Sequence, residues 1–185
     1  FLDLSIKINN EIREHPAYQE LSQFGVARGV HMMYQLSFFP VGYFEDVCWD
    51  EILEGYGGTD YVAQNQIKNM GCFCCPNRCM NFFSKHGIGK GLTSCEPFSG
   101  FTGAVWNLDM DTFLEATLMV NKLGMDCTET SASISLLMEL YHDKIITEKE
   151  TDGIAMERGS KEAILGTIQK IADREGYGDL LAEGQ

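Results

Sequence analysis

The stretch Gly71-Cys72-Phe73-Cys74-Cys75-Pro76-Asn77-Arg78-Cys79 holds four of the seven cysteines of this 185-residue chain. Within it, Cys72, Cys75 and Cys79 follow the spacing C-x2-C-x3-C. Two intervening residues let a tight turn bring two sulfurs onto one metal, and three more residues, about one helical turn, can return a third sulfur to the same point. Because thiolates repel one another, a metal ion or cluster is the simplest reason to gather them.

The residues alone leave the identity of the metal open. Zinc would take these three cysteines with either Cys74 or His86 as the fourth ligand, whereas a four-iron cluster would take the same three with a cysteine from elsewhere. Packing and disulfides explain the stretch less well, because so dense a group exceeds what packing needs and an odd total leaves one thiol over. The gap order, two then three, is the reverse of the C-x3-C-x2-C of radical SAM enzymes and argues against that class.

Composition and charge limit the function classes further. Apolar residues make up 44% of the chain, enough for a core, and no apolar run is long enough to span a membrane. A formal charge of −13 disfavours nucleic-acid binding, which needs clustered Lys and Arg. No targeting signal is visible, so a cytoplasmic protein is expected, and the missing initiator Met indicates a fragment of a longer polypeptide.

Helical periodicity dominates the pattern of apolar residues. It predicts helices over residues 3–14, 16–36, 49–53 and 61–68. The segment 38–44 between them is aromatic and is expected to be irregular and packed inward. Three further helices are expected to begin or end at residues with capping chemistry: Asp111 to Gly124, Thr128 or Thr130 onward, and Ser160 to Gly176.

Convincing strands with period-two alternation are missing, although the turn-rich segment after the cysteines can form a hairpin. The predicted fold class is therefore all-α, a multi-helical orthogonal array with at most one small β-hairpin near residues 82–96. Residues 1–185 are expected to form a single helical domain.

Three motifs follow the cysteine stretch in a fixed order: Cys95-Glu96-Pro97-Phe98, then Asn121-Lys122-Leu123-Gly124-Met125-Asp126, then Glu175-Gly176-Tyr177-Gly178-Asp179-Leu180-Leu181-Ala182-Glu183-Gly184. The second is close to D-x-x-G-L-D/C and the third is similar to G-x-G-D-x-L-A-x-G. Together with the C-x2-C-x3-C of Cys72, Cys75 and Cys79, these motifs form an ordered set over about residues 60–185 that resembles the tungsten-containing aldehyde:ferredoxin oxidoreductase family.

The resemblance implies an enzyme that oxidises a small aldehyde to a carboxylic acid and passes the electrons to ferredoxin. It implies a tungsten (or molybdenum) bis-pterin cofactor beside one [4Fe–4S] cluster. This chain resembles the middle helical domain, so the pterin-saddle domain and the last helical domain, with the fourth cluster cysteine, would lie outside it. The fragment alone is then expected to be inactive.

Carried over residue by residue, the resemblance assigns Cys72, Cys75 and Cys79 as cluster ligands. Glu96 matches the acid that takes a proton as the aldehyde carbon gains its oxygen. Cys95 is an alternative tungsten ligand, because ring-reducing relatives that act on aromatic acyl-CoA place a cysteine at about this position.

The resemblance also assigns Asn121, Gly124 and Asp126 to pterin binding. Asn121 departs from the Asp of the family motif and brings no charge to that position. Some members share an iron between subunits through E-x-x-H. The segment Glu115-Ala116-Thr117-Leu118 lacks the His, so no such interface iron is expected, and the oligomeric state stays open.

Two other functions remain in view. One is a divergent member of the same family that reduces an aromatic acyl-CoA. The other, from a different class, is a zinc-stabilised helical interaction module without catalysis. Cys74 has no role in the resemblance and is expected to be a packed thiol.

Overall fold

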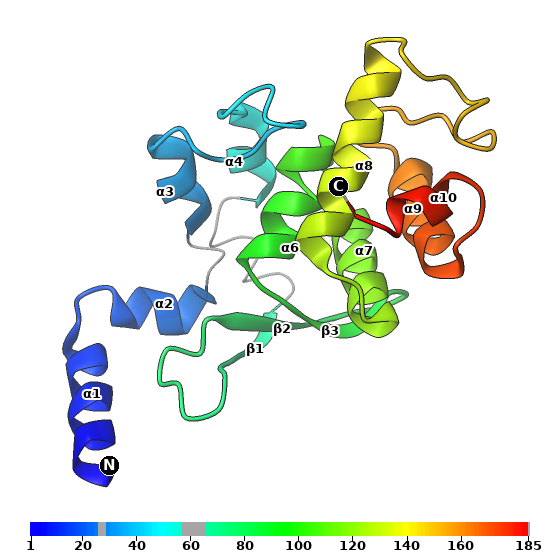
Figure 1. The fold of residues 1–185 in the computed structure, drawn as a ribbon. Helices are drawn as coiled ribbons and strands as arrows, with labels where there is room; N and C mark the ends of the chain where they lie inside the picture. The colour runs from blue at the N-terminus through cyan, green and yellow to red at the C-terminus, as the bar shows by residue number, and fades with distance from the viewer. Residues whose placement is uncertain (26–28, 57–65, 185) are drawn as a thin grey trace.

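A computed structural model of the chain describes residues 1–25, 29–56 and 66–184 (Figure 1). Helices dominate it, and one small sheet interrupts them, so the predicted fold class is confirmed. In chain order the elements are α1 (Leu2–Glu14), α2 (Tyr18–Phe24), α3 (Gly29–Gln35), α4 (Asp50–Tyr56), β1 (Gln66–Met70), β2 (Met80–Lys85), β3 (Gly89–Thr93), α6 (Cys95–Gly100), the 3-10 turn η2 (Gly103–Val105), α7 (Met110–Leu123), α8 (Cys127–His142), α9 (Lys161–Asp173) and α10 (Tyr177–Leu181).

The sheet is antiparallel with the strand order β1-β2-β3. Its β2–β3 pair confirms the expected hairpin, and β1 is an additional strand. The cysteine stretch is the connection between β1 and β2, because Met70 pairs with Met80. The helix predicted over 61–68 is wrong for residues 66–68, where cross-strand pairing with β2 overrides local helical spacing. Residues 61–65 lie outside the described part of the chain.

The hydrophobic core lies between the sheet and the C-terminal helices. Phe113 and Leu114 of α7, Ile134 of α8 and Ile164 of α9 are fully buried in it. The rings of Phe98 and Phe113 meet edge to face with centroids 5.5 Å apart, which joins α6 to α7. This core fixes the relative positions of α6, α7 and α8, and the candidate site is built on their ends.

The N-terminal part differs from the prediction at one glycine. The helix expected over 16–36 is two helices, α2 and α3, because the backbone at Gly25 takes φ +64 and ends α2. The helix expected over 3–14 is confirmed as α1, which buries none of its residues. The helix expected over 49–53 is confirmed as α4, which continues through Gly55 to Tyr56.

The aromatic segment 38–44 is only partly packed inward. Phe39 and Val41 are fully buried, whereas Tyr43 and Phe44 are exposed. Phe38 is exposed as well, so the expectation is wrong for these three side chains.

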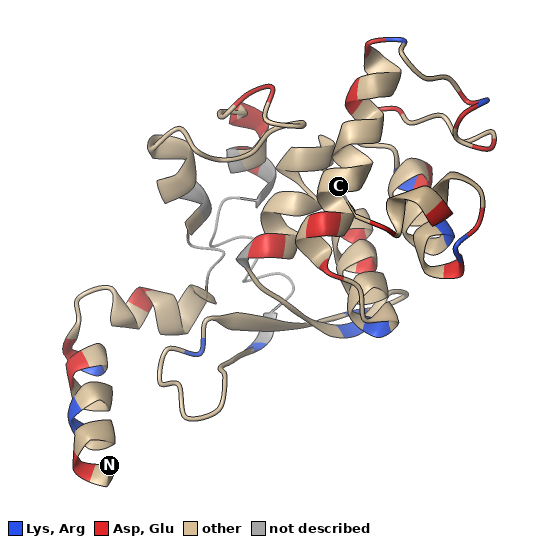
Figure 2. Ribbon diagram, viewed as in Figure 1, with Lys and Arg blue, Asp and Glu red and all other residues tan. Residues whose placement is uncertain are grey.

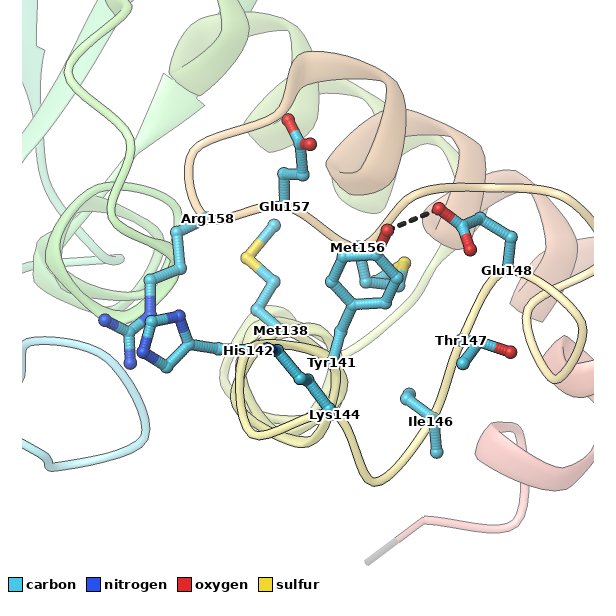
Figure 3. Close-up of a pocket in the computed structure, with 10 residues that line it drawn as sticks. All are labelled: Met138, Tyr141, His142, Lys144, Ile146, Thr147, Glu148, Met156, Glu157 and Arg158. Atoms are coloured by element: carbon cyan, nitrogen blue, oxygen red, sulfur yellow. Dashed lines mark hydrogen bonds between the residues drawn. The ribbon is translucent and has the colours of Figure 1, made fainter.

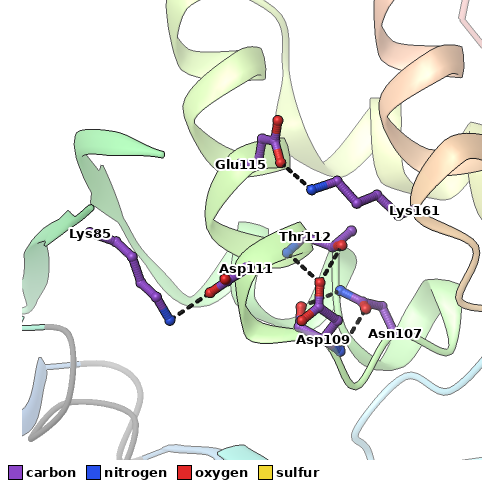
Figure 4. Close-up of polar contacts among 7 residues, drawn as sticks. All are labelled: Lys85, Asn107, Asp109, Asp111, Thr112, Glu115 and Lys161. Atoms are coloured by element: carbon purple, nitrogen blue, oxygen red, sulfur yellow. Dashed lines mark hydrogen bonds and ion pairs between the residues drawn. The ribbon is translucent and has the colours of Figure 1, made fainter. Parts of the chain in front are cut away.

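Two of the predicted helix starts are displaced by a few residues. Asp109, not Asp111, caps α7, since its carboxylate accepts hydrogen bonds from the Thr112 amide at 2.9 Å and the Thr112 hydroxyl at 2.6 Å. Asp111 lies in the first turn and pairs with Lys85 at 2.5 Å (Figure 4). An extended residue immediately before the first turn is the one whose side chain can reach the free amides.

Helix α8 is likewise capped by Asp126, whose carboxylate accepts from the Glu129 amide at 2.8 Å, and not by Thr128 or Thr130. The predicted N-cap Ser160 of α9 is confirmed. The predicted stop at Gly176 is wrong. Helix α9 ends at Asp173 with Arg174 as its left-handed C-cap, and Gly176 is the N-cap of α10.

None of the described helices is both long enough and apolar enough to cross a bilayer. Figure 2 shows acidic residues on most of the helices, in keeping with the net charge of −13.

We expect Asp109→Ala to lower the free energy of unfolding by about 1 kcal/mol, because the first amides of α7 lose their acceptor. Burial opposes ionisation of Asp109, but the Thr112 hydrogen bonds outweigh it and lower its pKa. The carboxylate's contribution is therefore present above the unfolded pKa of about 3.9 and is lost as pH falls through the lower folded pKa. Urea unfolding followed by circular dichroism, from neutral pH downward, measures both effects.

Asp109→Asn keeps a capping side chain and removes the titration, so its stability should show less acid dependence than the native protein. Asp111→Ala is the matched control and should cost less, because the pair with Lys85 is partly exposed. If Asp111→Ala costs more than Asp109→Ala, the assignment of the cap is wrong.

Candidate functional site

The connection between β1 and β2 folds back on itself. The Cys75 amide donates to the Cys72 carbonyl at 3.0 Å, so the C-x2-C segment forms a closed turn, as its spacing indicates. Cys74 and Arg78 take positive φ, +60 and +49, where the chain reverses. A Cβ on Gly71 would lie 3.1 Å from the Cys75 carbonyl oxygen, so the loop is compact at its base.

The thiols predicted as ligands share one neighbourhood. Burial raises the pKa of the Cys79 thiol, and the thiols of Cys75 and Cys72 add to the shift. Ionising all three would therefore be costly without a nearby cation. However, no three side chains of His, Cys, Asp or Glu in the described ranges are arranged to hold a metal ion. The role of these thiols as ligands stays a prediction.

A pair of asparagines anchors the two strands that carry the loop. Asn69 and Asn81 face each other across β1 and β2, and the Asn81 amide donates to Asn69 Oδ1 at 2.9 Å. Asn81 also donates to the Phe24 carbonyl at 3.3 Å, and Asn69 donates to the Ser22 carbonyl. These carbonyls lie at the C-terminal end of α2, so the pair, which we call the amide clamp, ties the loop's base to that helix. No motif in the sequence indicates this pair.

Glu96 lies in the first turn of α6, three residues after β3. Its carboxylate accepts a hydrogen bond from the Ser94 hydroxyl at 2.5 Å. The side chain is exposed and contributes to the pKa shifts of two thiols, Cys79 and Cys127. The structure describes only the backbone of the neighbouring Cys95. The role of Cys95 as an alternative tungsten ligand therefore stays a prediction.

The three predicted pterin residues lie where α7 passes into α8. Gly124 ends α7 with φ +69, and Asp126 caps α8. Asn121 donates its amide to the Leu92 carbonyl of β3 at 2.9 Å, so it ties the end of α7 to the sheet. Burial raises the pKa of the Cys127 thiol, and the carboxylates of Asp126 and Glu96 raise it further.

Residues far apart in sequence therefore meet at the start of α8. Glu96 of α6 lines one cavity with Thr128 of α8, and the pairing of Asn81 with Thr93 brings the end of the cysteine loop to the start of α6. The charge of Glu96 contributes to the raised pKa of the Cys79 and Cys127 thiols. The structure thus brings the predicted acid near one predicted cluster ligand and near the thiol beside the predicted pterin contact. This convergence depends on tertiary packing, and no local pattern indicates it.

A cavity of about 170 Å³ opens beside Glu96. Its other walls are the loop at 40–44, the C-terminal part of α6 and one face of α8. No motif predicts this cavity, and the aromatic character of residues 38–44 is the one related feature of the sequence.

A larger hollow, of about 450 Å³, lies at the opposite end of α8 (Figure 3). Its lining includes the fully buried Met138 and Met156, and Tyr141, whose hydroxyl donates to Glu148 at 2.5 Å. No predicted site residue lines it.

Arg158 at its edge joins three segments. It forms ion pairs with Glu139 of α8 and Glu45 of the 40–46 loop, and its guanidinium lies 4.9 Å from the Trp106 ring centroid. Burial opposes ionisation of Glu139, but hydrogen bonds from Arg158 and Trp106 outweigh it and lower the pKa of that carboxyl.

A family model and the similar curated proteins point to the same family. The family model described as "Aldehyde ferredoxin oxidoreductase, domains 2 & 3" matches residues 3–185. The tungsten-containing aldehyde ferredoxin oxidoreductase of Pyrococcus furiosus is 30% identical over 189 residues, covering 95% of this chain and 29% of the relative. That of Thermococcus kodakarensis is 28% identical with the same coverage. The chain thus spans less than a third of these curated relatives.

A solved structure shares the fold. It is the active site complex BamBC of benzoyl coenzyme A reductase in complex with 1,5-dienoyl-CoA, with a TM-score of 0.62 at 22% identity. The match covers 94% of this chain and 24% of that chain.

We expect Asn81→Ala to destabilise the protein by about 1–3 kcal/mol, because the buried Asn81 side chain is removed and its hydrogen bonds to Asn69 Oδ1 and the Phe24 carbonyl are lost. Hydrogen exchange should show faster opening of β1 and β2 before the rest of the sheet. Asn10→Ala, an exposed change on α1, is the matched control. Equal costs for the two variants would show that the amide clamp does not hold the loop.

Proposed function

Because this chain belongs to the aldehyde ferredoxin oxidoreductase family, we propose that it is the helical part of a tungsten-dependent enzyme that oxidises an aldehyde to a carboxylic acid and reduces ferredoxin. In this proposal residues 1–185 act as one helical domain. The fourth cluster cysteine and the pterin saddle come from polypeptide outside this sequence. The observation that carries the proposal is the placement of Glu96. The pairing of Asn81 with Thr93 brings the end of the cysteine loop to the start of α6, and Glu96 lines one cavity with Thr128, close to Asp126 and Cys127 in sequence.

A [4Fe–4S] cluster would be held by Cys72, Cys75 and Cys79. The chemistry of the donor set fits, since the closed turn and the raised pKa of Cys79 indicate thiols that a cation would stabilise as thiolates. The amide clamp holds both ends of the loop, and Cys72 and Cys74 between them are exposed. Cys74 is exposed, so the expectation of a packed thiol is wrong, and we assign it no ligand role.

A pterin would be held where α7 meets α8. Asp126 uses Oδ1 for the helix cap, and its Oδ2 can accept a pterin N–H. Gly124 leaves the approach open, because no atom lies within 4 Å of where its Cβ would be. Asn121 brings no charge to the site. Its hydrogen bond to the Leu92 carbonyl fixes the position of this turn relative to β3.

When bound, the tungsten centre would take two electrons from the aldehyde and the cluster would pass them on singly to ferredoxin. The conversion adds the oxygen of water to the aldehyde carbon and releases two protons with those electrons. Glu96 is the base that accepts a proton as the carbon–oxygen bond forms. The Ser94 hydroxyl, 2.5 Å from Oε2, orients this carboxylate.

We expect Cys72→Ser, Cys75→Ser or Cys79→Ser to remove the broad visible absorbance of sulfide-bridged iron from the full-length, anaerobically purified enzyme. Each change removes one thiolate of the cluster. Cys74→Ser is the matched control from the same loop and should keep both absorbance and iron. Bound zinc without visible absorbance would instead support the zinc-stabilised module.

Glu96→Gln should lower kcat by about 100- to 10,000-fold, because an amide cannot accept the proton. Tungsten and iron contents, measured by mass spectrometry of the metals, should stay unchanged. The control is Glu162→Gln, an exposed glutamate in the first turn of α9. A Glu96→Gln enzyme with native kcat would exclude Glu96 as the base.

A further inference from the structure

The cavity beside Glu96 is built from three segments that meet there. Tyr43 and Phe44 line one side, α6 contributes Glu96 and Gly100, and α8 contributes Ala132 with its small neighbours. Among the described lining residues, Glu96 is the charged one. A carboxylate at the wall of an otherwise apolar hollow is the arrangement in which a base meets an apolar substrate.

The aromatic wall is held rigidly in place. The loop closes through two hydrogen bonds between Val41 and Asp46, at 3.1 and 3.2 Å, and the Gly42 amide donates to the Gly103 carbonyl at 3.0 Å. The ion pair of Glu45 with Arg158 adds a third attachment. Such anchoring positions exposed side chains that would otherwise move freely.

Phe44 itself is unusual. Its backbone has φ +60, a left-handed conformation that bulky residues rarely adopt, and its ring is 72% exposed. Because the ring is exposed, it adds no packing to the core, and the left-handed conformation lowers stability without a compensating contact there. This conformation places the Phe44 ring at the cavity wall, which points to a functional role for the strained residue.

The α8 wall is apolar in practice although it carries hydroxyl groups. The Ser131 hydroxyl donates to the Thr128 carbonyl at 3.1 Å, and the Ser135 hydroxyl donates to the Ala104 carbonyl at 2.6 Å. The Ser99 hydroxyl of α6 likewise donates to the Glu96 carbonyl at 3.2 Å. With these donors used on the backbone, the cavity presents mainly carbon to a ligand.

We propose that this cavity binds the body of the substrate and selects aldehydes whose flat apolar part is about the size of a benzene ring, with Tyr43, Phe44 and Ala132 setting the limit. This rests on the proposed function. The cavity volume of about 170 Å³ is large enough for a benzene ring, since an apolar cavity of about 150 Å³ accommodates benzene. The neutral aldehyde enters beside the Glu96 carboxylate, and once Glu96 has released the accepted proton to solvent, its charge repels the anionic acid product.

The test is Ala132→Leu in the full-length holoenzyme, which fills the cavity from α8. The ratio of kcat/KM for benzaldehyde to that for acetaldehyde should fall by about 10-fold or more, because only the larger substrate needs the volume. Ala172→Leu, an exposed alanine on α9, is the matched control and should keep the native ratio. An unchanged ratio in Ala132→Leu would overturn the proposal.

Phe44→Ala is the second variant, chosen because an exposed ring can be removed without emptying the core. It should also lower the benzaldehyde-to-acetaldehyde ratio. Should Ala132→Leu fail to fold, a native ratio in Phe44→Ala overturns the proposal by itself.

A binding measurement separates this proposal from the proposed function. Benzyl alcohol, a neutral and unreactive probe, should bind the native enzyme and Ala172→Leu in saturation-transfer NMR and bind Ala132→Leu about 10-fold more weakly or less. Equal binding to all three overturns the cavity assignment. A tungsten-loaded native enzyme that oxidises neither aldehyde, yet binds benzyl alcohol at this cavity, refutes the proposed function and leaves the cavity assigned to a neutral aryl ligand.

Discussion

The close approach of α6 to α8 is the contact on which the rest of the site depends. Helix α6 ends at Gly100, and any Cβ there would collide with the Ser131 side chain of α8. Only a glycine lets the two helices come this near, and this separation sets both the convergence of Glu96 with Cys127 and the width of the adjoining cavity.

The cysteine loop combines a fixed base with an adaptable middle. The amide clamp attaches β1 and β2 to α2, and the closed turn from Cys72 to Cys75 shapes the first half of the loop. Beyond it, Phe73 is almost fully exposed and no metal-ready grouping is present among the described residues. A connection of this kind can close around a cofactor without disturbing the sheet that carries it.

The features of the fold that depend on local sequence were predicted correctly. The C-terminal helices follow from apolar spacing over many turns, and the C-x2-C turn follows from its own length. Prediction failed where one local pattern offered two answers, as with Asp109 and Asp111 at the start of α7. Residues 66–68 became a strand because β2 pairs with them, and the meeting of Glu96, Cys127 and Asp126 needs the packed core. Neither is visible in a single stretch of chain. The ligand and pterin roles remain predictions.

Arg158 couples the 40–46 loop, Trp106 and α8, because it contacts all three. It is the shared cation of Glu45 and Glu139, so its loss would leave two carboxylates without their counter-charge. Replacing one of the acids alone would leave the other still satisfied. Substitution at position 158 therefore affects the 40–46 loop and α8 together, with the larger cost at the less exposed Glu139.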